Sequence, residues 1–135
     1  CAGEIVCQTP PKLCSSAEAY EAILPLVRRR RFESMWAFFL NSHNAIIGKR
    51  EICRGTASMC TVHPRDVFGA AISRNAISII LAHNHPSGDP TPSPEDEALT
   101  DRLVHAGKLM GIPVLDHLII GSGGYYSFRD MGQIQ

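Results

Sequence analysis

Apolar residues follow two different spacings along this chain, and these separate the expected strands from the expected helices. Runs rich in β-branched and aromatic residues, such as the one containing Trp36, Phe38 and Phe39, are typical of strands. The run 76–81 is apolar throughout, which predicts a central strand buried on both faces. The expected strands span residues 33–40, 45–53, 76–81, 112–120 and 125–128, with a further edge strand at 5–8.

Other segments carry apolar residues at intervals of three or four, the spacing of amphipathic helices. Pro64 stands at a first helical position, where its missing N–H costs nothing, and Gly111 is a C-terminal cap. Pro25 lies inside the first helix and is expected to kink or shorten it. The expected helices span residues 16–31, 64–75 and 94–110. Helices interleaved with strands predict one α/β domain over residues 1–135, built around a mixed sheet.

Charge adds little to this picture. Lys plus Arg and Asp plus Glu both number 13, so the global charge favours no nucleic acid, membrane or acidic substrate. The run Arg28–Arg31 could contact phosphates, but a solvated helix end, where positive charge complements the helix dipole, is the favoured explanation. Five cysteines without compact spacing, and no signal peptide or apolar span, predict free thiols and a cytoplasmic setting. The chain begins at Cys1, so it could be a fragment of a longer protein.

The main chemical signal lies between the central strand and the last helix. His83 and His85 are expected to follow the strand directly, and at positions i and i+2 their imidazoles point to the same face. Asp96 stands in the first turn of the helix, so a proline-rich loop can return its carboxylate to them. Three such ligands leave one position open, the arrangement of catalytic zinc. Ser93 and Asp96 are also explained by an ordinary helix start, and the two readings are compatible.

The stretch His83-x-His85-x7-Ser93-x-x-Asp96 matches without a gap the motif of the JAB/MPN metalloprotease (JAMM) superfamily. The surrounding residues 83–88, read as HNHPSG, and the segment LDHLIIG at 115–121 resemble the RadC branch of that superfamily. The resemblance covers residues 4–134. RadC proteins typically carry a helix-hairpin-helix module as well, for which this sequence shows no segment.

The resemblance implies a three-layer, deaminase-like α/β/α fold and a metallohydrolase that cleaves peptide or isopeptide bonds. It implies one zinc ion per chain held by His83, His85 and Asp96, with a water molecule as fourth ligand. It also implies Glu33 as general base and Ser93 as hydrogen-bond donor to the oxyanion. Without the family, spacing alone does not favour Glu33 over Glu51.

Several interpretations stay open at this point. Asp116 and His117 match the RadC pattern and could support the site, or be ordinary strand residues. The string His-Asn-His around Asn84 is unrelated to HNH nucleases, whose residues are dispersed. His43, His63 and His105 are expected to be structural or exposed. Alternative functions are a metal-dependent nuclease, a DNA-binding accessory protein, or a scaffold without catalysis. The strand at 5–8 could pair across a homodimer.

Overall fold

A computed structural model describes residues 13, 15–27, 32–55 and 62–134 of the chain. Five strands form a single sheet in the order β2-β1-β3-β4-β5. They are β1 (Ser34–Leu40), β2 (Ile46–Arg54), β3 (Ser78–Asn84), β4 (Val114–Ile120) and β5 (Tyr125–Ser127). The β3–β4 pair is parallel and the other three pairs are antiparallel. The predicted mixed sheet is therefore confirmed.

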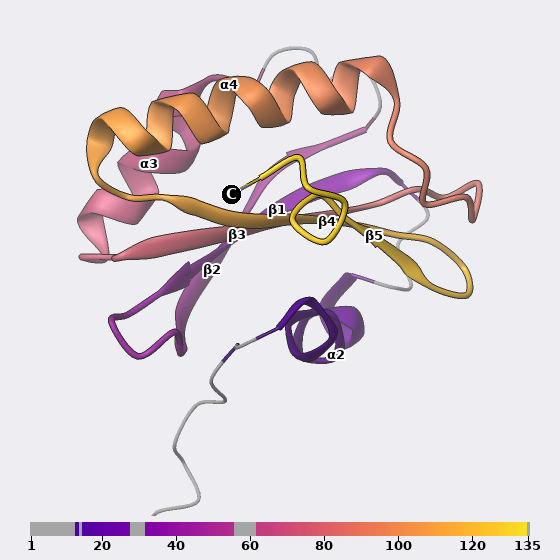
Figure 1. The fold of residues 1–135 in the computed structure, drawn as a ribbon, viewed down its shortest axis with the longest axis horizontal. Coiled ribbons are helices and arrows are strands. Elements are labelled where there is room, and N and C mark those ends of the chain that lie inside the picture. Colours follow the sequence, from indigo (N-terminus) through magenta and orange to yellow (C-terminus); the bar gives the residue numbers. More distant parts are fainter. Residues whose placement is uncertain (1–12, 14, 28–31, 56–61, 135) are drawn as a thin grey trace, which may run out of the picture.

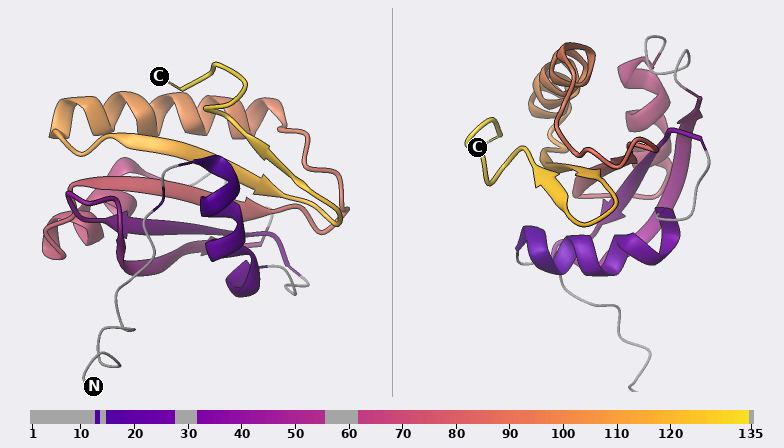
Figure 2. Two further views of the ribbon diagram at one scale, coloured as in Figure 1. Left: turned by 60° about the horizontal axis from the view of Figure 1, so that its bottom comes forward. Right: turned by 90° about the vertical axis from the view of Figure 1, so that its right-hand side faces the viewer.

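Helices cover both faces of this sheet. The described helices are α2 (Ser16–Val27), α3 (Pro64–Ser73) and α4 (Pro94–Met110). Helices α3 and α4 lie on one face, whereas α2 lies alone on the other (Figure 1). The end-on view in Figure 2 shows the same three layers. The α/β/α arrangement implied by the family resemblance is confirmed.

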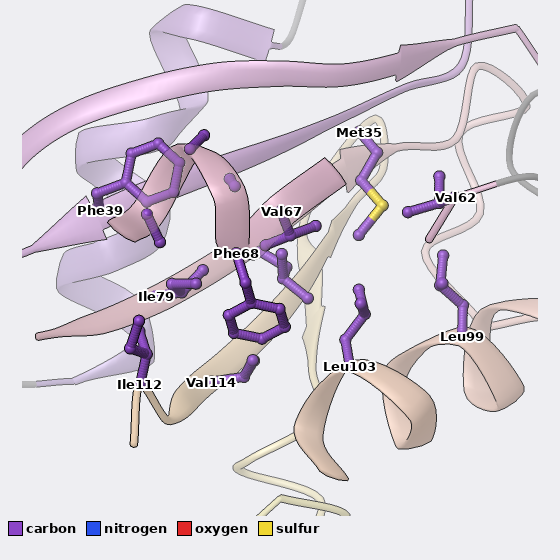
Figure 3. Packing of buried hydrophobic residues seen from close by; sticks show 14 of the residues in the cluster. Met35, Phe39, Val62, Val67, Phe68, Ile79, Leu99, Leu103, Ile112 and Val114 are labelled. Atoms are coloured by element: carbon purple, nitrogen blue, oxygen red, sulfur yellow. The ribbon is translucent and has the colours of Figure 1, made fainter. Parts of the chain in front are cut away.

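The two faces of the sheet bury separate hydrophobic clusters. On one face, residues such as Phe39 and Ile79 pack against Phe68 of α3 and Leu103 of α4 (Figure 3). On the other face, Phe38 and its neighbours pack against α2. Successive strand residues alternate between the two clusters, as the period-two geometry of a strand requires. All seven residues of β3 are buried, as predicted for a central strand.

The structure corrects several predicted boundaries. The central strand is Ser78–Asn84 rather than 76–81, so Ile77 precedes it and is exposed, and His83 lies within it instead of following it. Pairing on both sides explains the extension, because His83 faces Met35 of β1 and Ile119 of β4. The structure also leaves exposed two apolar residues that stand at helical spacing with buried ones. Ile72 in α3 and Met110 at the end of α4 are exposed rather than buried.

Some predictions fall on residues outside the described ranges. These are the edge strand at 5–8, the proposed dimer contact through it, and the arginine run 28–31. Helix α2 is described as far as Val27 and includes Pro25. None of the helices in the described part of the chain combines the length and apolar character needed to cross a membrane.

Candidate metal centre

The candidate ligands come from three elements that meet at one end of the sheet. His83 is the penultimate residue of β3, His85 follows the strand, and Asp96 is the third residue of α4. Glu33 immediately precedes β1, which runs antiparallel to β3 with Met35 opposite His83. Because of that register, the start of β1 lies beside the end of β3. Ligand atoms of all four side chains lie within 4.8 Å of one another.

The nitrogen and oxygen atoms of the three predicted ligands converge closely. The Nε2 atoms of His83 and His85 are 3.0 Å apart. Asp96 Oδ1 lies 3.3 Å from Nε2 of His83, and Asp96 Oδ2 lies 3.2 Å from Nε2 of His85. The side chains of His83 and Asp96 are 1% and 6% exposed and that of His85 is 14% exposed, so the centre is reached from the His85 side.

Local hydrogen bonds orient His85 for metal binding. Its Nδ1 lies 2.8 Å from the Asp89 carbonyl oxygen, which can only accept a hydrogen bond. Nδ1 therefore carries a proton, and in the neutral imidazole the lone pair is on Nε2, the atom that faces His83 and Asp96. A ligand histidine held by a carbonyl on its other nitrogen is the usual arrangement in metal sites. The residues present therefore fit a metal ion such as zinc.

The start of α4 positions the carboxylate. Ser93 is the N-cap, with its Oγ accepting a hydrogen bond from the Asp96 backbone N–H at 3.1 Å. The Ser93 backbone N–H donates in turn to Asp96 Oδ2 at 2.8 Å. This reciprocal capping box fixes the rotamer of Asp96 and is compatible with ligation, since Oδ1 remains directed at His83. The capping box of α4 thus includes one of the candidate metal ligands.

The surroundings of Asp96 favour the ionised form of its carboxyl group beside the imidazoles. Burial alone would raise the pKa of Asp96, but the imidazoles of His83 and His85 beside it hold that pKa well below its usual range. The same contact with Asp96 raises the pKa of His85, although burial opposes the shift. Burial lowers the pKa of His117 well below its ordinary value, so this third imidazole is neutral.

The loop between His85 and Ser93 is fastened to the turn after β4. The backbone N–H of His85 donates to the Ile120 carbonyl at 3.0 Å, and that of Ser122 donates to the Gly88 carbonyl at 3.0 Å. Gly121 makes this close approach feasible, because a Cβ there would lie 2.3 Å from the Gly88 oxygen. The loop that supplies the Asp89 carbonyl is therefore held in place by the sheet.

Asn84 supports the candidate site in a way that the sequence interpretation missed. Its Oδ1 accepts hydrogen bonds from the backbone N–H and the hydroxyl of Ser34, at 2.9 Å and 3.1 Å. Its Nδ2 donates to the Phe32 carbonyl at 3.0 Å. Asn84 thus holds the residues on both sides of Glu33, continuing the β1–β3 contact beyond the last backbone pair, Met35 and His83. A buried amide at a strand end was the signal that could have drawn attention to it.

The other residues singled out in the sequence differ in whether they contact the candidate ligands. His117 contacts His83, with 2.8 Å between its Nε2 and Nδ1 of His83. Asp116 instead accepts hydrogen bonds from the Ser127 hydroxyl and the Arg129 N–H, so it joins β4 to the segment around β5. The three histidines expected to be structural or exposed are exposed and lie outside the candidate ligand group: His43, His63 and His105.

The fold is an α/β domain in which helices cover both faces of a mixed sheet. Its candidate metal site consists of imidazoles and carboxylates at the end of a strand. Residues 13–133 match the family described as the RadC-like JAB domain. The chain therefore belongs to the RadC-like JAB domain family, as its motif had indicated.

Three relatives illustrate the similarity. The chain is 48% identical over 120 residues to a UPF0758 protein of Symbiobacterium thermophilum, covering 89% of this chain and 51% of the relative. It is 45% identical over 123 residues to a UPF0758 protein of Methanococcoides burtonii, covering 91% and 54%. It is 42% identical over 125 residues to a UPF0758 protein of Thermotoga maritima, covering 93% and 56%. The chain thus spans about half the length of the curated relatives it matches.

Proposed function

We propose that this chain is a zinc-dependent hydrolase that cleaves peptide or isopeptide bonds. The observation that carries the proposal is the convergence of two Nε2 atoms and one carboxylate, with the Glu33 carboxylate within 4.8 Å of them. Two histidines and one carboxylate are a ligand set of catalytic zinc, which keeps a position open for water. Imidazole ligands also favour zinc over magnesium or calcium, which prefer oxygen. A single zinc ion per chain would bind all three of these ligands.

A bound zinc ion would supply a Lewis acid that makes water nucleophilic near neutral pH. The other steps fall to residues of the chain. The Glu33 carboxylate takes a proton from the attacking water and returns it to the leaving amine, so that water and an amide yield a carboxylic acid and an amine. Glu33 is half-buried and its neighbours are fixed by Asn84, which suits a base held in one place.

Ser93 is the proposed donor to the carbonyl oxygen, which becomes negative during attack. Its Oγ already accepts a hydrogen bond from Asp96, so the hydroxyl proton is available for a second bond. Within the part of the chain that the structure describes, no acceptor for that proton is found. Because Ser93 is half-buried beside a ligand, its hydroxyl is available to a substrate at the centre.

The first test measures metal and turnover together. The purified chain is loaded with zinc, dialysed and assayed for metal, then incubated with a library of quenched fluorescent peptides and isopeptides. We expect about one zinc per chain, and cleavage that stops when a chelator removes the metal and returns when zinc is restored. A chain that retains no zinc after loading would contradict the metal centre. Stoichiometric zinc without cleavage would instead favour the scaffold alternative.

Metal affinity is expected to fall as the pH is lowered. The contact with Asp96 raises the pKa of His85 above its usual value of about 6.5, so protons compete with the metal for Nε2. Below that raised pKa, the dissociation constant for zinc should rise about tenfold for each pH unit, with one proton released on binding. Well above it, this dependence should disappear. Zinc titrations across pH 5 to 8 would check the trend, and an affinity independent of pH would contradict it.

A nucleic-acid partner is the remaining alternative from the sequence. Its main support, Arg28–Arg31, lies outside the described residues, and no described feature favours it. Binding of DNA that weakens steeply with added salt and is lost when these arginines are replaced would revive it.

A further inference from the structure

A buried chain of side chains from three elements leads to one of the candidate ligands. Thr100 lies on α4, His117 on β4 and His83 on β3. Thr100 and His83 are 1% exposed and His117 is fully buried. Thr100 Oγ1 is 2.6 Å from His117 Nδ1, and His117 Nε2 is 2.8 Å from His83 Nδ1. The function proposed above assigns no role to Thr100 or His117.

We propose that Thr100 and His117 are positioning residues that set the tautomer of His83, so that its Nε2 lone pair faces the metal site. The inference rests on the proposed metal centre, which gives that lone pair its purpose. The direction of each hydrogen bond can nevertheless be worked out from the protein atoms alone.

The assignment of donors and acceptors begins at a backbone carbonyl. The Thr100 hydroxyl lies 2.7 Å from the Asp96 carbonyl oxygen, which can only accept, so the hydroxyl donates its proton there. Thr100 Oγ1 then has only lone pairs to offer His117, and His117 Nδ1 must be the donor. A fully buried imidazole with no carboxylate bonded to it is neutral, because an uncompensated charge there would be costly. His117 Nε2 therefore carries a lone pair.

The same logic extends to the ligand. Because His117 Nε2 can only accept, His83 Nδ1 must donate to it, and in the neutral ring the lone pair of His83 is on Nε2. That atom faces His85 Nε2 at 3.0 Å and Asp96 Oδ1 at 3.3 Å. The Phe128 ring stacks on His117 with 4.9 Å between centroids and 10° between planes, which fixes the plane of the His117 ring. We call the chain of hydrogen bonds from Thr100 through His117 to His83 the relay.

Two independent arrangements thus give both histidines the same tautomer. The tautomer of His85 is set by the Asp89 carbonyl, and the tautomer of His83 is set by the relay from Thr100. Two lone pairs directed at each other at 3.0 Å, beside a carboxylate, repel unless a proton or a metal cation lies among them. The relay also begins at the Asp96 carbonyl, so the first turn of α4 positions the carboxylate ligand and orients His83 at the same time.

The test compares two substitutions that separate hydrogen bonding from packing. Thr100→Val keeps the branched shape and loses the hydroxyl, whereas Thr100→Ser keeps the hydroxyl and loses a methyl group. We expect Thr100→Val to raise the zinc dissociation constant about 10- to 100-fold, and Thr100→Ser to stay close to the original chain. A role in packing alone predicts the reverse order, because only serine leaves a cavity. Zinc affinity is measured by competition with a chromophoric chelator.

Ser73→Ala is the matched control. The Ser73 hydroxyl also bonds to a carbonyl of its own helix, that of Ala70 at 2.9 Å, and Ser73 does not belong to the candidate ligand group. Its removal should leave zinc affinity unchanged. Thermal unfolding of each variant shows whether a change in affinity follows from a loss of folded protein.

A second measurement addresses the tautomer without metal. Nitrogen NMR of the histidine rings in the metal-free chain at alkaline pH should show His83 and His117 with the proton on Nδ1. His83 with its proton on Nε2 would overturn the proposal, as would Thr100→Val binding zinc as tightly as the original chain. If the original chain itself binds no zinc, the proposed function fails, and the tautomer spectrum still decides the relay.

Discussion

Replacing Asp96 by asparagine is expected to remove metal binding while leaving the protein folded. Asparagine can still accept the Ser93 backbone N–H, so the helix start is preserved, but the anionic oxygen directed at His83 is lost. Structural zinc sites are worth about 10–16 kcal/mol over four ligands, so the loss of one ligand should weaken binding by about 100- to 1,000-fold. The measurement is zinc content after dialysis, together with a chelator competition.

The chain supplies a matched control for this substitution. Asp66 occupies the corresponding position in α3, where its Oδ2 accepts the His63 backbone N–H at 2.8 Å and where Pro64 again begins the helix. Asp66→Asn makes the same chemical change in a helix start without candidate metal ligands. Both substitutions should cost about 1 kcal/mol of helix stability or less, whereas only Asp96→Asn should lose zinc. Equal zinc affinity in the two variants would exclude Asp96 as a ligand.

Replacing Glu33 by glutamine should abolish turnover and leave zinc bound. Glutamine has nearly the same shape but cannot take a proton from water, and general-base catalysis typically contributes about 100- to 10,000-fold. The rate is measured on the peptide or isopeptide that the zinc-loaded chain cleaves fastest. Zinc content is measured on the same preparation, so that a lost base is distinguished from a lost metal.

Glu51→Gln is the control for the general base. Glu51 is the other glutamate that spacing left open, and it pairs with Arg54 through Oε1 at 2.8 Å on strand β2, at the edge of the sheet. It does not belong to the candidate ligand group. Its replacement should leave the rate unchanged. A Glu33→Gln chain that cleaves at the original rate would remove Glu33 from the mechanism.

The position of the centre follows from the architecture. Strand β3 is buried on both faces, and its end carries His83 and leads directly to His85. Helix α4 connects β3 to its parallel neighbour β4, so the start of the helix must lie near the end of β3. Ligand sites at the carboxyl ends of strands in α/β sheets arise from this connectivity. Here the edge of the site is completed by β1, which runs in the opposite direction.

Features that depend on neighbouring residues could be predicted from the amino-acid sequence. The start of α4 at Ser93 and Pro94 and its end at Gly111 are capping signals within a few positions, and both are found where predicted. The central strand was found in part, since residues 78–81 of the predicted run 76–81 are buried in it, because a strand covered on both faces is apolar at successive positions. The mixed sheet was also predicted. The match of His83, His85 and Asp96 to a family motif also lies within one local stretch.

The residues from distant parts of the chain that join this stretch became clear from the fold. Glu33 lies near His83 because β1 pairs with β3, and nothing in the spacing of the two residues records that register. Asn84 fixes the segment around Glu33 across 50 positions of sequence, and His117 reaches His83 across 34. Hydrogen bonds depend on distance in space, and strand pairing sets that distance independently of separation along the chain. The candidate ligand set is therefore local in the sequence, whereas the residues that support it depend on the pairing of strands.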